Sequence, residues 1–480
     1  MSADTTTATT ALCVDLDGTL LASDVLYETA AQYLGQNPFR IFRLASWLAK
    51  GKRVLKERLA EHAVLDVTVL PYRTEVLELI ATARERGRPV YLVTAAAGGP
   101  ARAIAAHLGV FDGVVSTDAE HGNLSGARKA EYLVERFGDG AFEYVGDSNR
   151  DLPVWRAAGS ATAVGVSPGT RRELERDGRD ASFIDVPRAG FGTWLRQLRV
   201  HQATKNLLVF VPILLAHEFL SWDPLWRVIV MFIAFTVLSF GTYVMNDLHD
   251  LEKDRRHPAK RTRPLASGLL GIPTATVVGV VLIAVGLAAS AILGWQSLAI
   301  LVAYLVLTTL YSLVLRRVLL GDVLALAGLY TIRIFAGAIA ADVALTIWTV
   351  LTSVFLFFSL ALMKRYSELA KYDLETSGGR GYLKRDRPAV LAAGITSGMM
   401  AVLVIAMYID SDVAQQSYGT PQLLWAIVPL VLFWITRLWL LTERGAMHDD
   451  PVAFAIGDRV SQAVAVIAAA IVATAALVGR

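Results

Sequence analysis

The sequence predicts a two-domain protein, with an α/β domain at residues 1–187 and an all-α membrane bundle at residues 188–480. Hydrophobic residues make up 54% of the 480-residue chain and are unevenly distributed. Up to about Arg199 the chain is charged like an ordinary globular domain, whereas beyond Asn206 it consists mostly of apolar runs of membrane-spanning length. In the first part, strand-like runs alternate with helix-like segments, which is typical of a parallel sheet covered by helices. A segment with Pro and Gly, roughly 185–192, joins the two parts.

Charge and cysteine content narrow the expected compartment. The formal net charge is +3, and no nucleic-acid partner is expected. Cys13 is the single cysteine, which excludes an intrachain disulfide and fits a reducing compartment. The N-terminal sequence MSADTTTATTA lacks the basic-then-apolar pattern of a signal peptide. We therefore expect the first domain to lie in the cytosol.

Nine apolar runs predict nine transmembrane helices, at about 206–221, 225–245, 270–293, 296–315, 320–341, 346–364, 389–408, 422–442 and 460–478. Lys and Arg gather in alternate connections, whereas 294–295, 341–346 and 410–422 contain neither; only Arg227 interrupts the pattern. By the positive-inside rule the basic loops are cytoplasmic. The pattern predicts a multi-pass protein of the cell (inner) membrane with its N-terminus inside and its C-terminus outside.

Polar side chains follow several predicted strands of the first domain. The run Ala11–Leu20 places two aspartates directly after a strand, two residues apart and therefore on the same side, and Gly18 allows a sharp turn. In a parallel, Rossmann-like sheet the carboxyl ends of the strands form the site. The candidate residues, in chain order, are Asp15, Asp17, Thr94, Lys129, Asp147 and Asp151.

The pattern Asp-x-Asp-Gly-Thr-Leu, with the later segments in this order, resembles the haloacid-dehalogenase (HAD) phosphatases. The resemblance implies that Asp15 attacks a phosphomonoester to form an aspartyl-phosphate, and that Asp17 is the general acid and base. It also implies that Thr94 and Lys129 hold the phosphoryl oxygens. The implied Mg²⁺ ligands are Asp15, the carbonyl of Asp17, and Asp147, with Asp151 supporting the site.

An insertion at about 24–70 has the size of a HAD cap. It contains apolar and basic residues at helical spacing, including Phe39, Phe42 and Trp47. One interpretation is a cap helix that packs on its own domain. The other is that these side chains and nearby cations rest on the membrane surface, which would bring the phosphatase to a lipid-linked substrate.

The segment Asn246–Gly268, NDLHDLEKDRRHPAKRTRPLASG, lies between two apolar runs. Asp247, Asp250 and Asp254 recur at spacings of three and four, which places them on one face of a helix. Carboxylates that hold Mg²⁺ beside cations that hold phosphate oxygens predict a diphosphate site. A solvated loop whose cations only set topology is the alternative, but it does not explain an acid triad at the end of a membrane span.

The order Asn-Asp-x-x-Asp-x-x-x-Asp, followed by His-Pro and Arg-Pro-Leu-Ala-Ser-Gly, resembles the first aspartate-rich motif of the UbiA superfamily. Those intramembrane transferases act on isoprenoid phosphates or diphosphates with Mg²⁺. The resemblance implies the nine-helix UbiA fold, with Mg²⁺ held by Asp247, Asp250 and Asp254. Residues implied to bind the diphosphate nearby are Asn246, Lys260, Arg261 and Arg263.

The pattern Leu-Arg-x-x-Gln-x-x-Lys205-Asn206 resembles one branch of that superfamily, the decaprenyl-phosphate phosphoribosyltransferases. These use phosphoribosyl diphosphate as donor and a polyprenyl phosphate as acceptor. The Asp449-Asp-Pro-Val-Ala-Phe-Ala segment resembles the last cytoplasmic loop of the branch. Most prenyltransferases of the superfamily have a second aspartate-rich motif, and Asp373 and Glu375 are compatible with this alternative. The further implied substrate-binding residues are Lys205, Asn206, Tyr311, Arg333, Lys364, Arg365 and Glu368.

The two halves suggest one reaction sequence. Transfer of phosphoribose to a lipid phosphate leaves a 5-phosphate, and a HAD phosphatase would remove it to give polyprenyl-phosphoryl-ribose. One alternative is an aromatic prenyltransferase, which leaves the phosphatase unexplained. Another is a passive lipid-binding or transport bundle in which only the HAD domain is catalytic. The acceptor chain length and the oligomeric state stay open.

Overall fold

The computed structural model describes residues 10–117, 124–178, 180–371, 381–447 and 450–477. The side chains of residues 38, 52, 53 and 371 are also outside the description. The chain divides into two compact units. The first contains residues 1–198 together with 243–280, and the second contains 199–242 together with 281–480. The helices α11 (Trp222–His249) and α13 (Ile272–Ile292) each contribute residues to both units.

A parallel sheet with the strand order β3-β2-β1-β4-β5-β6 forms the centre of the first unit. The strands are β1 (Ala11–Val14), β2 (Val90–Ala97), β3 (Gly113–Thr117), β4 (Phe142–Gly146), β5 (Ser160–Val164) and β6 (Asp180–Ile184). Leu12 pairs with Val90 of β2 and with Glu143 of β4, so β1 lies at the centre. The strand order reverses between β1 and β4, which is where parallel sheets place their sites.

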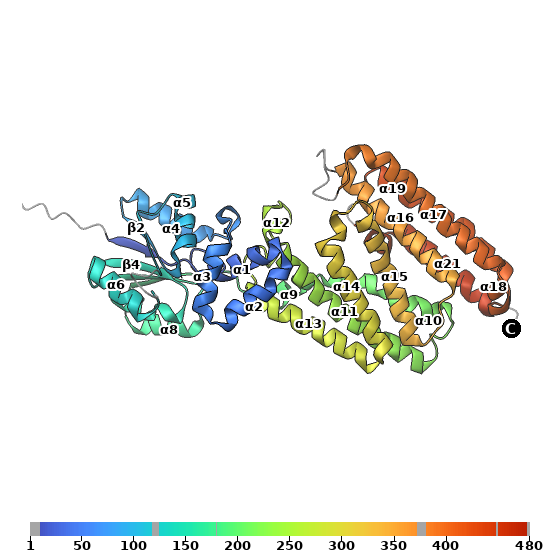
Figure 1. The fold of residues 1–480 in the computed structure, drawn as a ribbon, viewed down its shortest axis with the longest axis horizontal. Coiled ribbons are helices and arrows are strands. Elements are labelled where there is room, and N and C mark those ends of the chain that lie inside the picture. The colour runs from blue at the N-terminus through green and yellow to red at the C-terminus, as the bar shows by residue number, and fades with distance from the viewer. Residues whose placement is uncertain (1–9, 118–123, 179, 372–380, 448–449, 478–480) are drawn as a thin grey trace, which may run out of the picture. The chain divides into compact units, whose positions relative to one another are not determined.

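Helices cover both faces of the sheet (Figure 1). Because side chains alternate along a strand, Leu12 and Val14 of β1 join one apolar core while Cys13 joins the other. The first core receives residues from α4 (Thr74–Glu85) and α5 (Gly98–Leu108). The second receives residues from α6 (Ala127–Phe137), α7 (Leu152–Ala157) and α8 (Pro168–Arg176).

The predicted cap region forms helices between β1 and α4. They are α1 (Val25–Gln36), α2 (Ile41–Ala49) and α3 (Lys52–His62), with short 3₁₀ turns at Pro38–Arg40 and Val67–Val69. Trp47 packs on Tyr33, with ring centroids 5.5 Å apart, and so belongs to the cap core. Phe39 and Phe42 are 73% and 75% exposed. Membrane contact of this exposed pair stays a prediction.

A second group of helices completes the first unit. It contains α9 (Phe191–Leu198), the end of α11, α12 (Leu251–Arg256) and the start of α13. The turn at Gly268 has a φ of +78°, and a Cβ there would lie 2.8 Å from the Cβ of Ala22. Glycine is therefore required at this close approach. Leu251, Leu265 and other residues of this segment form an apolar core with Trp194.

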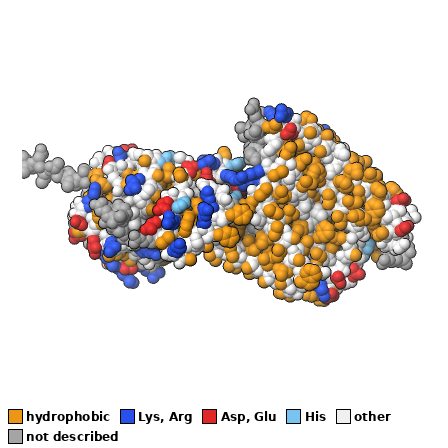
Figure 2. Space-filling view, viewed as in Figure 1, with side chains coloured by type: hydrophobic (Ala, Val, Ile, Leu, Met, Phe, Trp, Pro, Cys, Tyr) orange, Lys and Arg blue, Asp and Glu red, His pale blue; other side chains and the backbone are white. Residues whose placement is uncertain are grey.

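Eight helices in the described residues are long and apolar enough to cross a membrane. Besides α11 and α13 they include α14 (Trp295–Leu313), α15 (Gly321–Ala341), α16 (Ile347–Lys371), α17 (Arg387–Asp410), α19 (Ile427–Glu443) and α21 (Arg459–Leu477). Hydrophobic side chains cover the visible outer surface of the long helices (Figure 2). The chain is thus a multi-pass membrane protein.

The segment predicted as the first of nine spans is shorter than expected. It folds as a 3₁₀ stretch, Val200–Phe210, followed by α10 (Val211–Leu215). This apolar piece, Val200–Leu215, falls short of the about 20 residues that a spanning α-helix needs. Pro212 lacks a backbone N–H, and His217 has a φ of +59°, so a regular helix does not continue through 206–221. A ninth span is therefore not confirmed.

Short connecting helices are α18 (Asp412–Ser417), α20 (Pro451–Gly457) and the 3₁₀ turns Asn149–Asp151, Leu315–Arg317, Lys384–Asp386 and Pro421–Ala426.

Within the second unit, α15 is the most enclosed of the candidate spans. Gly337 of α15 faces the backbone of Val209 so closely that an added Cβ would lie 1.9 Å from that carbonyl oxygen. The close approach explains why α15 packs tightly against the Val200–Phe210 stretch.

Candidate functional site

Two aspartates meet at the carboxyl ends of the central strands. Asp15 directly follows β1, and its backbone N–H donates to the carbonyl of Val145 in β4 at 2.9 Å. Asp147 directly follows β4. Since β1 and β4 are adjacent and parallel, their ends place these two carboxylates together.

Asp15, Asp147 and Asp151 form a candidate metal centre. One carboxylate oxygen from each lies within 4.8 Å of the others. Asp151 is positioned by backbone N–H groups of Asp147 and Ser148, which donate to its Oδ2 at 3.3 and 3.2 Å. Three converging carboxylates fit a hard divalent cation such as Mg²⁺. Among the described residues, this is the one group of at least three His, Cys, Asp or Glu side chains whose ligand atoms lie within 4.8 Å of one another.

Lys129, on α6, completes this cluster. Its Nζ lies 3.1 Å from Asp15 Oδ1 and 3.6 Å from Asp151 Oδ1. Tyr144 connects the same groups, because it accepts from Lys129 at 2.7 Å and donates to Asp151 Oδ1 at 2.9 Å. Lys129, Tyr144 and Asp151 are all buried. The side chain of Lys129 is therefore fixed beside Asp15.

Asp17 and Thr94 lie in different environments. The Oδ1 atom of Asp17 accepts from the backbone N–H of Val25, the first residue of α1, at 2.8 Å. Thr94 is fully buried, and its Oγ1 accepts from the N–H of Ala96 at 3.0 Å. The strand β2 does not end at Thr94, as expected from the sequence, but continues to Ala97 with a register shift after Val93.

Burial raises the pKa values of three site carboxyl groups, those of Asp15, Asp17 and Asp147. It raises the pKa of Asp15 to about 6, assisted by the charge of Asp151 and opposed by Lys129. It raises the pKa of Asp17 to about 7, with a further contribution from Asp24. Burial, then the charges of Asp15 and Asp151, raises the pKa of Asp147 to about 7. A carboxyl group with a pKa near neutrality can both donate and accept a proton, as acid–base catalysis requires.

Gly18 is the turn residue that brings Asp147 close to the first aspartates. Its φ is +77°, and a Cβ there would lie 2.2 Å from Asp147 Oδ2. Thr19 donates to Asp147 Oδ1 at 3.5 Å. The turn therefore has no room for a side chain between the two strand ends.

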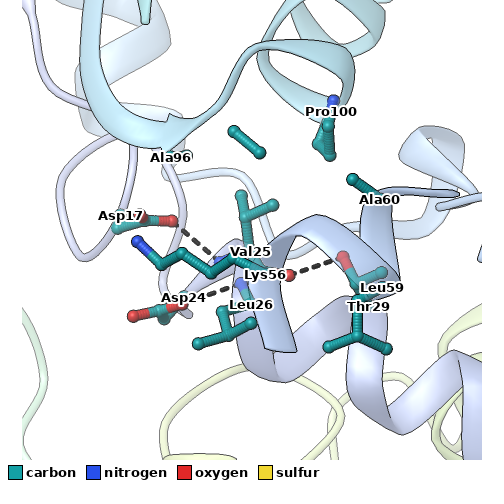
Figure 3. A pocket seen from close by; sticks show the side chains of 11 residues that line it. Asp17, Asp24, Val25, Leu26, Thr29, Lys56, Leu59, Ala60, Ala96 and Pro100 are labelled. Atoms are coloured by element: carbon teal, nitrogen blue, oxygen red, sulfur yellow. Dashed lines mark hydrogen bonds between the residues drawn. The ribbon is translucent and has the colours of Figure 1, made fainter. Parts of the chain in front are cut away.

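A pocket opens between the cap and the strand ends (Figure 3). The cap helix α3 contributes Lys56, which points toward Asp17 and Asp24. The Nζ of Lys56 also donates to the Ala95 carbonyl at 3.4 Å. Leu59, Ala60, Ala96 and Pro100 form apolar walls. Lys56 and Tyr144 could not be predicted as site residues, because their spacing is that of ordinary surface lysines and strand tyrosines.

The aspartate-rich segment forms a second acidic group in the first unit. Asp247 lies in the last turn of α11, Asp250 precedes α12, and Asp254 lies on α12. Gln197 donates to Asp247 Oδ2 at 2.9 Å, and Leu265 N–H donates to Gln197 Oε1 at 3.2 Å. Asp250 pairs with Lys253 at 3.3 Å.

Arg263 connects two of these carboxylates. Its Nη1 forms an ion pair with Asp254 and lies 3.4 Å from Asp247 Oδ1. Lys260 Nζ lies 3.8 Å from Asp254 Oδ1. The Arg263 guanidinium group thus bridges Asp247 and Asp254. Asn246 is half-buried on α11, and Arg261 is exposed on the following turn.

A third group lies in the second unit. Lys205, Tyr330, Lys364 and Asp450 line one pocket together with apolar residues of α15 and α16. Asp450 forms an ion pair with Lys205, and the Tyr330 hydroxyl lies 3.3 Å from both of its carboxylate oxygens. Burial alone would raise the pKa of Asp450, but the charges of Lys205 and Lys364 outweigh it and lower the pKa to about 2. Asp450 was not among the predicted site residues.

The other predicted residues of the bundle take part in buried contacts. Arg333 donates through Nε to Asn206 Oδ1 at 2.9 Å and stacks against Phe235, Tyr304 and Tyr330. Arg365 is fully buried, with Nε 2.6 Å from Asp322 Oδ2 and an ion pair to Glu368. Tyr311 packs at the edge of an apolar core. Asp373, Glu375 and Asp449 lie outside the described residues.

Comparison with known proteins assigns both halves to families. Residues 207–456, more than half of the chain, match the model of the UbiA prenyltransferase family. The chain belongs to the UbiA prenyltransferase family. In this UbiA family member, residues 12–156 match the model of haloacid dehalogenase-like hydrolases. The protein therefore joins a UbiA-type transferase domain to a HAD phosphatase domain.

Relatives of this UbiA family member cover either most of the chain or a little over half of it. The protein y4nM of Sinorhizobium fredii is 37% identical over 94% of this chain and 88% of its own length. Nodulation protein NoeC of Azorhizobium caulinodans is 34% identical over 56% of this chain and 88% of its own length. Decaprenyl-phosphate phosphoribosyltransferase of Mycobacterium tuberculosis is 27% identical over 56% of this chain and 90% of its own length.

Proposed function

We propose that the protein is a bifunctional membrane enzyme that makes polyprenyl-phosphoryl-ribose. The membrane domain transfers 5-phosphoribose from phosphoribosyl diphosphate to a polyprenyl phosphate, and the HAD domain then removes the 5-phosphate. The observation that carries the proposal is the phosphatase cluster, in which Lys129 lies 3.1 Å from Asp15 and three carboxylates converge. Simple prenyl transfer makes no phosphomonoester for such a cluster to hydrolyse.

The donor and acceptor are inferred from the relatives and from charge. The name of the Mycobacterium tuberculosis relative specifies a decaprenyl phosphate acceptor and a phosphoribosyl group. Transfer from C1 of phosphoribosyl diphosphate breaks the bond from C1 to the diphosphate oxygen and forms one to the lipid phosphate oxygen. The phosphate on C5 stays in the product. The first product is therefore a substrate of the chemical class that HAD phosphatases hydrolyse.

In the transfer step, Asp247, Asp250 and Asp254 are the residues that would hold Mg²⁺. Bound Mg²⁺ supplies Lewis-acid stabilisation of the departing diphosphate. Arg263 and Lys260, which lie beside Asp254, neutralise further negative charge. In the second unit, Lys205 and Lys364 supply cations for phosphate oxygens, and Asp450 orients Lys205. The protein contributes positioning and charge rather than a covalent intermediate.

In the hydrolytic step, Asp15 attacks the phosphorus atom of the 5-phosphate. The bond from phosphorus to the sugar oxygen breaks, and Asp17 donates a proton to that oxygen. A water molecule then attacks the aspartyl-phosphate, Asp17 accepts its proton, and inorganic phosphate leaves. Lys129 stabilises charge on the phosphoryl oxygens. Asp15, the Asp17 carbonyl and Asp147 would hold Mg²⁺, with Asp151 supporting the site. We place both reactions at the cytoplasmic side of the inner membrane.

The transfer step is tested with the purified full-length protein in nanodiscs. Polyprenyl phosphate, Mg²⁺ and ribose-labelled phosphoribosyl diphosphate are supplied, and label in the lipid fraction is counted. We expect transfer by the wild type and a loss on the order of a hundredfold in Asp254→Asn, because removing one charged ligand weakens stabilisation of the leaving group. Asp223→Asn is the matched control, since Asp223 is an exposed carboxylate that pairs with Arg227 on α11.

An absence of labelled lipid would contradict the proposal if an isoprenyl diphosphate and an aromatic acceptor react under the same conditions. That result would assign the membrane domain to aromatic prenyl transfer instead. Label in lipid without dependence on Asp254 would contradict the assigned site.

A further inference from the structure

The helix α1 of the HAD domain contacts the phosphatase site at its N-terminus. The N–H of Val25 donates to Asp17 Oδ1 at 2.8 Å, and Asp24 caps the helix by accepting from Leu26 N–H at 2.8 Å. The position of this first turn therefore fixes the position of the Asp17 carboxylate.

One turn further along, α1 is joined to the aspartate-rich segment of the transferase domain. Glu28 is fully buried and accepts two hydrogen bonds from Arg255, at 2.6 and 2.7 Å. The side chain of Arg255 is 5% exposed, and its Nε donates to the Ala266 carbonyl at 2.9 Å. Such a bidentate pair fixes orientation as well as distance. Both residues belong to the first compact unit.

Several other contacts join the same two segments, and Figure 1 shows α1 beside α12. Tyr27 and Ala31 of α1 pack on the apolar core that contains Leu251 and Leu265. Gly268 approaches Ala22 closely, and Arg256 forms an ion pair with Asp66. These contacts involve the start of the cap, α1 and the turn near residue 66, so the interface has several points of attachment.

The helix α12 also carries a residue of the proposed transfer site. Asp254 and Arg255 are consecutive, and consecutive side chains of an α-helix point about 100° apart. Asp254 faces Arg263 and Lys260, whereas Arg255 faces Glu28. A short helix of six residues therefore contacts both the aspartate-rich site and the phosphatase cap.

We propose that Glu28 and Arg255 are positioning residues of the phosphatase, through which the transferase segment holds α1 and thereby orients Asp17. The phosphatase site is then incomplete without a segment of the membrane domain. This inference rests on the proposed role of Asp17 as general acid and base. It does not depend on the identity of the lipid substrate.

The test uses the full-length protein with Glu28→Gln, Arg255→Gln and the double variant. Amide hydrogen exchange is measured in the first turn of α1 and in strands β1 and β4, and hydrolysis of p-nitrophenyl phosphate is measured with Mg²⁺. We expect Arg255→Gln to increase exchange in the first turn of α1 while the strands stay protected. We expect kcat to fall on the order of tenfold to a hundredfold with KM within about twofold, because misplacement affects the reacting geometry.

The double variant should be no worse than either single variant, since the two side chains act as one unit. Glu173→Gln is the matched control, because Glu173 forms an exposed ion pair with Arg156 in the same domain. Unchanged exchange in the first turn of α1 would overturn the inference, as would loss of protection in β1 and β4, which would make the pair a determinant of folding. Inactivity of the wild type toward phosphomonoesters would instead contradict the proposed function, and the exchange measurement would still decide the positioning claim.

Discussion

The ammonium group of Lys129 lies 3.1 Å from Asp15 Oδ1 and is buried with it. Burial would lower the pKa of Lys129, but the charges of Asp15 and Asp151 outweigh that effect and raise it. Lys129 is therefore a permanent cation beside the proposed nucleophile. It offsets the negative charge of the surrounding carboxylates and is placed to stabilise a phosphoryl group.

Replacing Lys129 with Met should remove this cation while preserving side-chain length. We expect kcat for p-nitrophenyl phosphate to fall on the order of a hundredfold, since a preorganised charge at the reacting group is lost. Lipid labelling by phosphoribosyl diphosphate should be unchanged. Arg128→Met is the control, because Arg128 is the exposed neighbour on α6. Equal effects of the two substitutions would contradict the assigned role.

The raised pKa of Asp147 predicts that the stability of the metal-free HAD domain depends on pH. Its native pKa of about 7 exceeds the ordinary value of 3.8, so the native state binds more protons than the unfolded state between these pH values. This group's contribution to stability therefore falls as pH rises from about 4 to about 7, and the penalty is complete above that range.

Asp147→Asn should remove the penalty. At pH 8 in EDTA we expect β1 and β4 to become more stable to exchange by on the order of 1–4 kcal/mol, with a smaller difference at pH 5. Adding Mg²⁺ should stabilise the wild type and not the variant, because a ligand that binds only the native state stabilises it. A variant that is less stable at pH 8 in EDTA would contradict the assigned charge repulsion.

Gly18→Ala should inactivate the phosphatase and spare the transferase. The new Cβ would lie 2.2 Å from Asp147 Oδ2 at a φ of +77°, so either the turn or Asp147 must move. We expect at least a hundredfold loss of phosphomonoester hydrolysis, since about 1 Å of misplacement is enough for such a loss. Gly99→Ala is the control, as a Cβ there meets no atom within 4 Å. Full activity of Gly18→Ala would disprove the proposed geometry.

Asp450→Asn should impair phosphoribosyl transfer and spare phosphomonoester hydrolysis, the reverse of the result expected for Gly18→Ala. It removes the negative charge between Lys205 and Lys364 but keeps an oxygen that can cap α20. We expect kcat/KM for phosphoribosyl transfer to fall at least about tenfold, because loss of a largely buried ion-pair partner disturbs both cations. Hydrolysis of p-nitrophenyl phosphate should not change. Asp412→Asn, an exposed carboxylate on α18, is the control, and a phosphatase defect in Asp450→Asn would argue against separate sites.

Much of the phosphatase half could be predicted because its polar residues follow strands. A strand followed directly by aspartates places them at one sheet edge, and parallel pairing of β1 and β4 then joins Asp15 to Asp147. The side-chain contacts that form only when the domain folds and buries them could not be predicted. Nothing in the spacing shows that Tyr144 bonds Lys129 and Asp151, or that Lys56 points toward Asp17.

In the membrane half, too, some features could be predicted from the sequence and others could not. Apolar length identified the eight long helices, but Pro212 interrupts the segment 206–221, and hydropathy does not register that effect. Long-range pairs were also beyond the sequence. Asp450 contacts Lys205 across 245 positions, and Arg255 contacts Glu28 across 227. Nothing in the basic run after Asp254 indicates that the guanidinium group of Arg255 binds Glu28 of the phosphatase cap.

The central claim is that the HAD domain acts on the product of the membrane domain, and the lipid product of Asp15→Asn tests it most directly. Full-length wild type and variant are supplied with polyprenyl phosphate, Mg²⁺ and ribose-labelled phosphoribosyl diphosphate, and the labelled lipids are analysed by mass spectrometry. The account predicts labelled lipid from both proteins, with the 5-phosphate retained only in the variant. Labelled lipid that carries the 5-phosphate equally in both would contradict the coupled pathway.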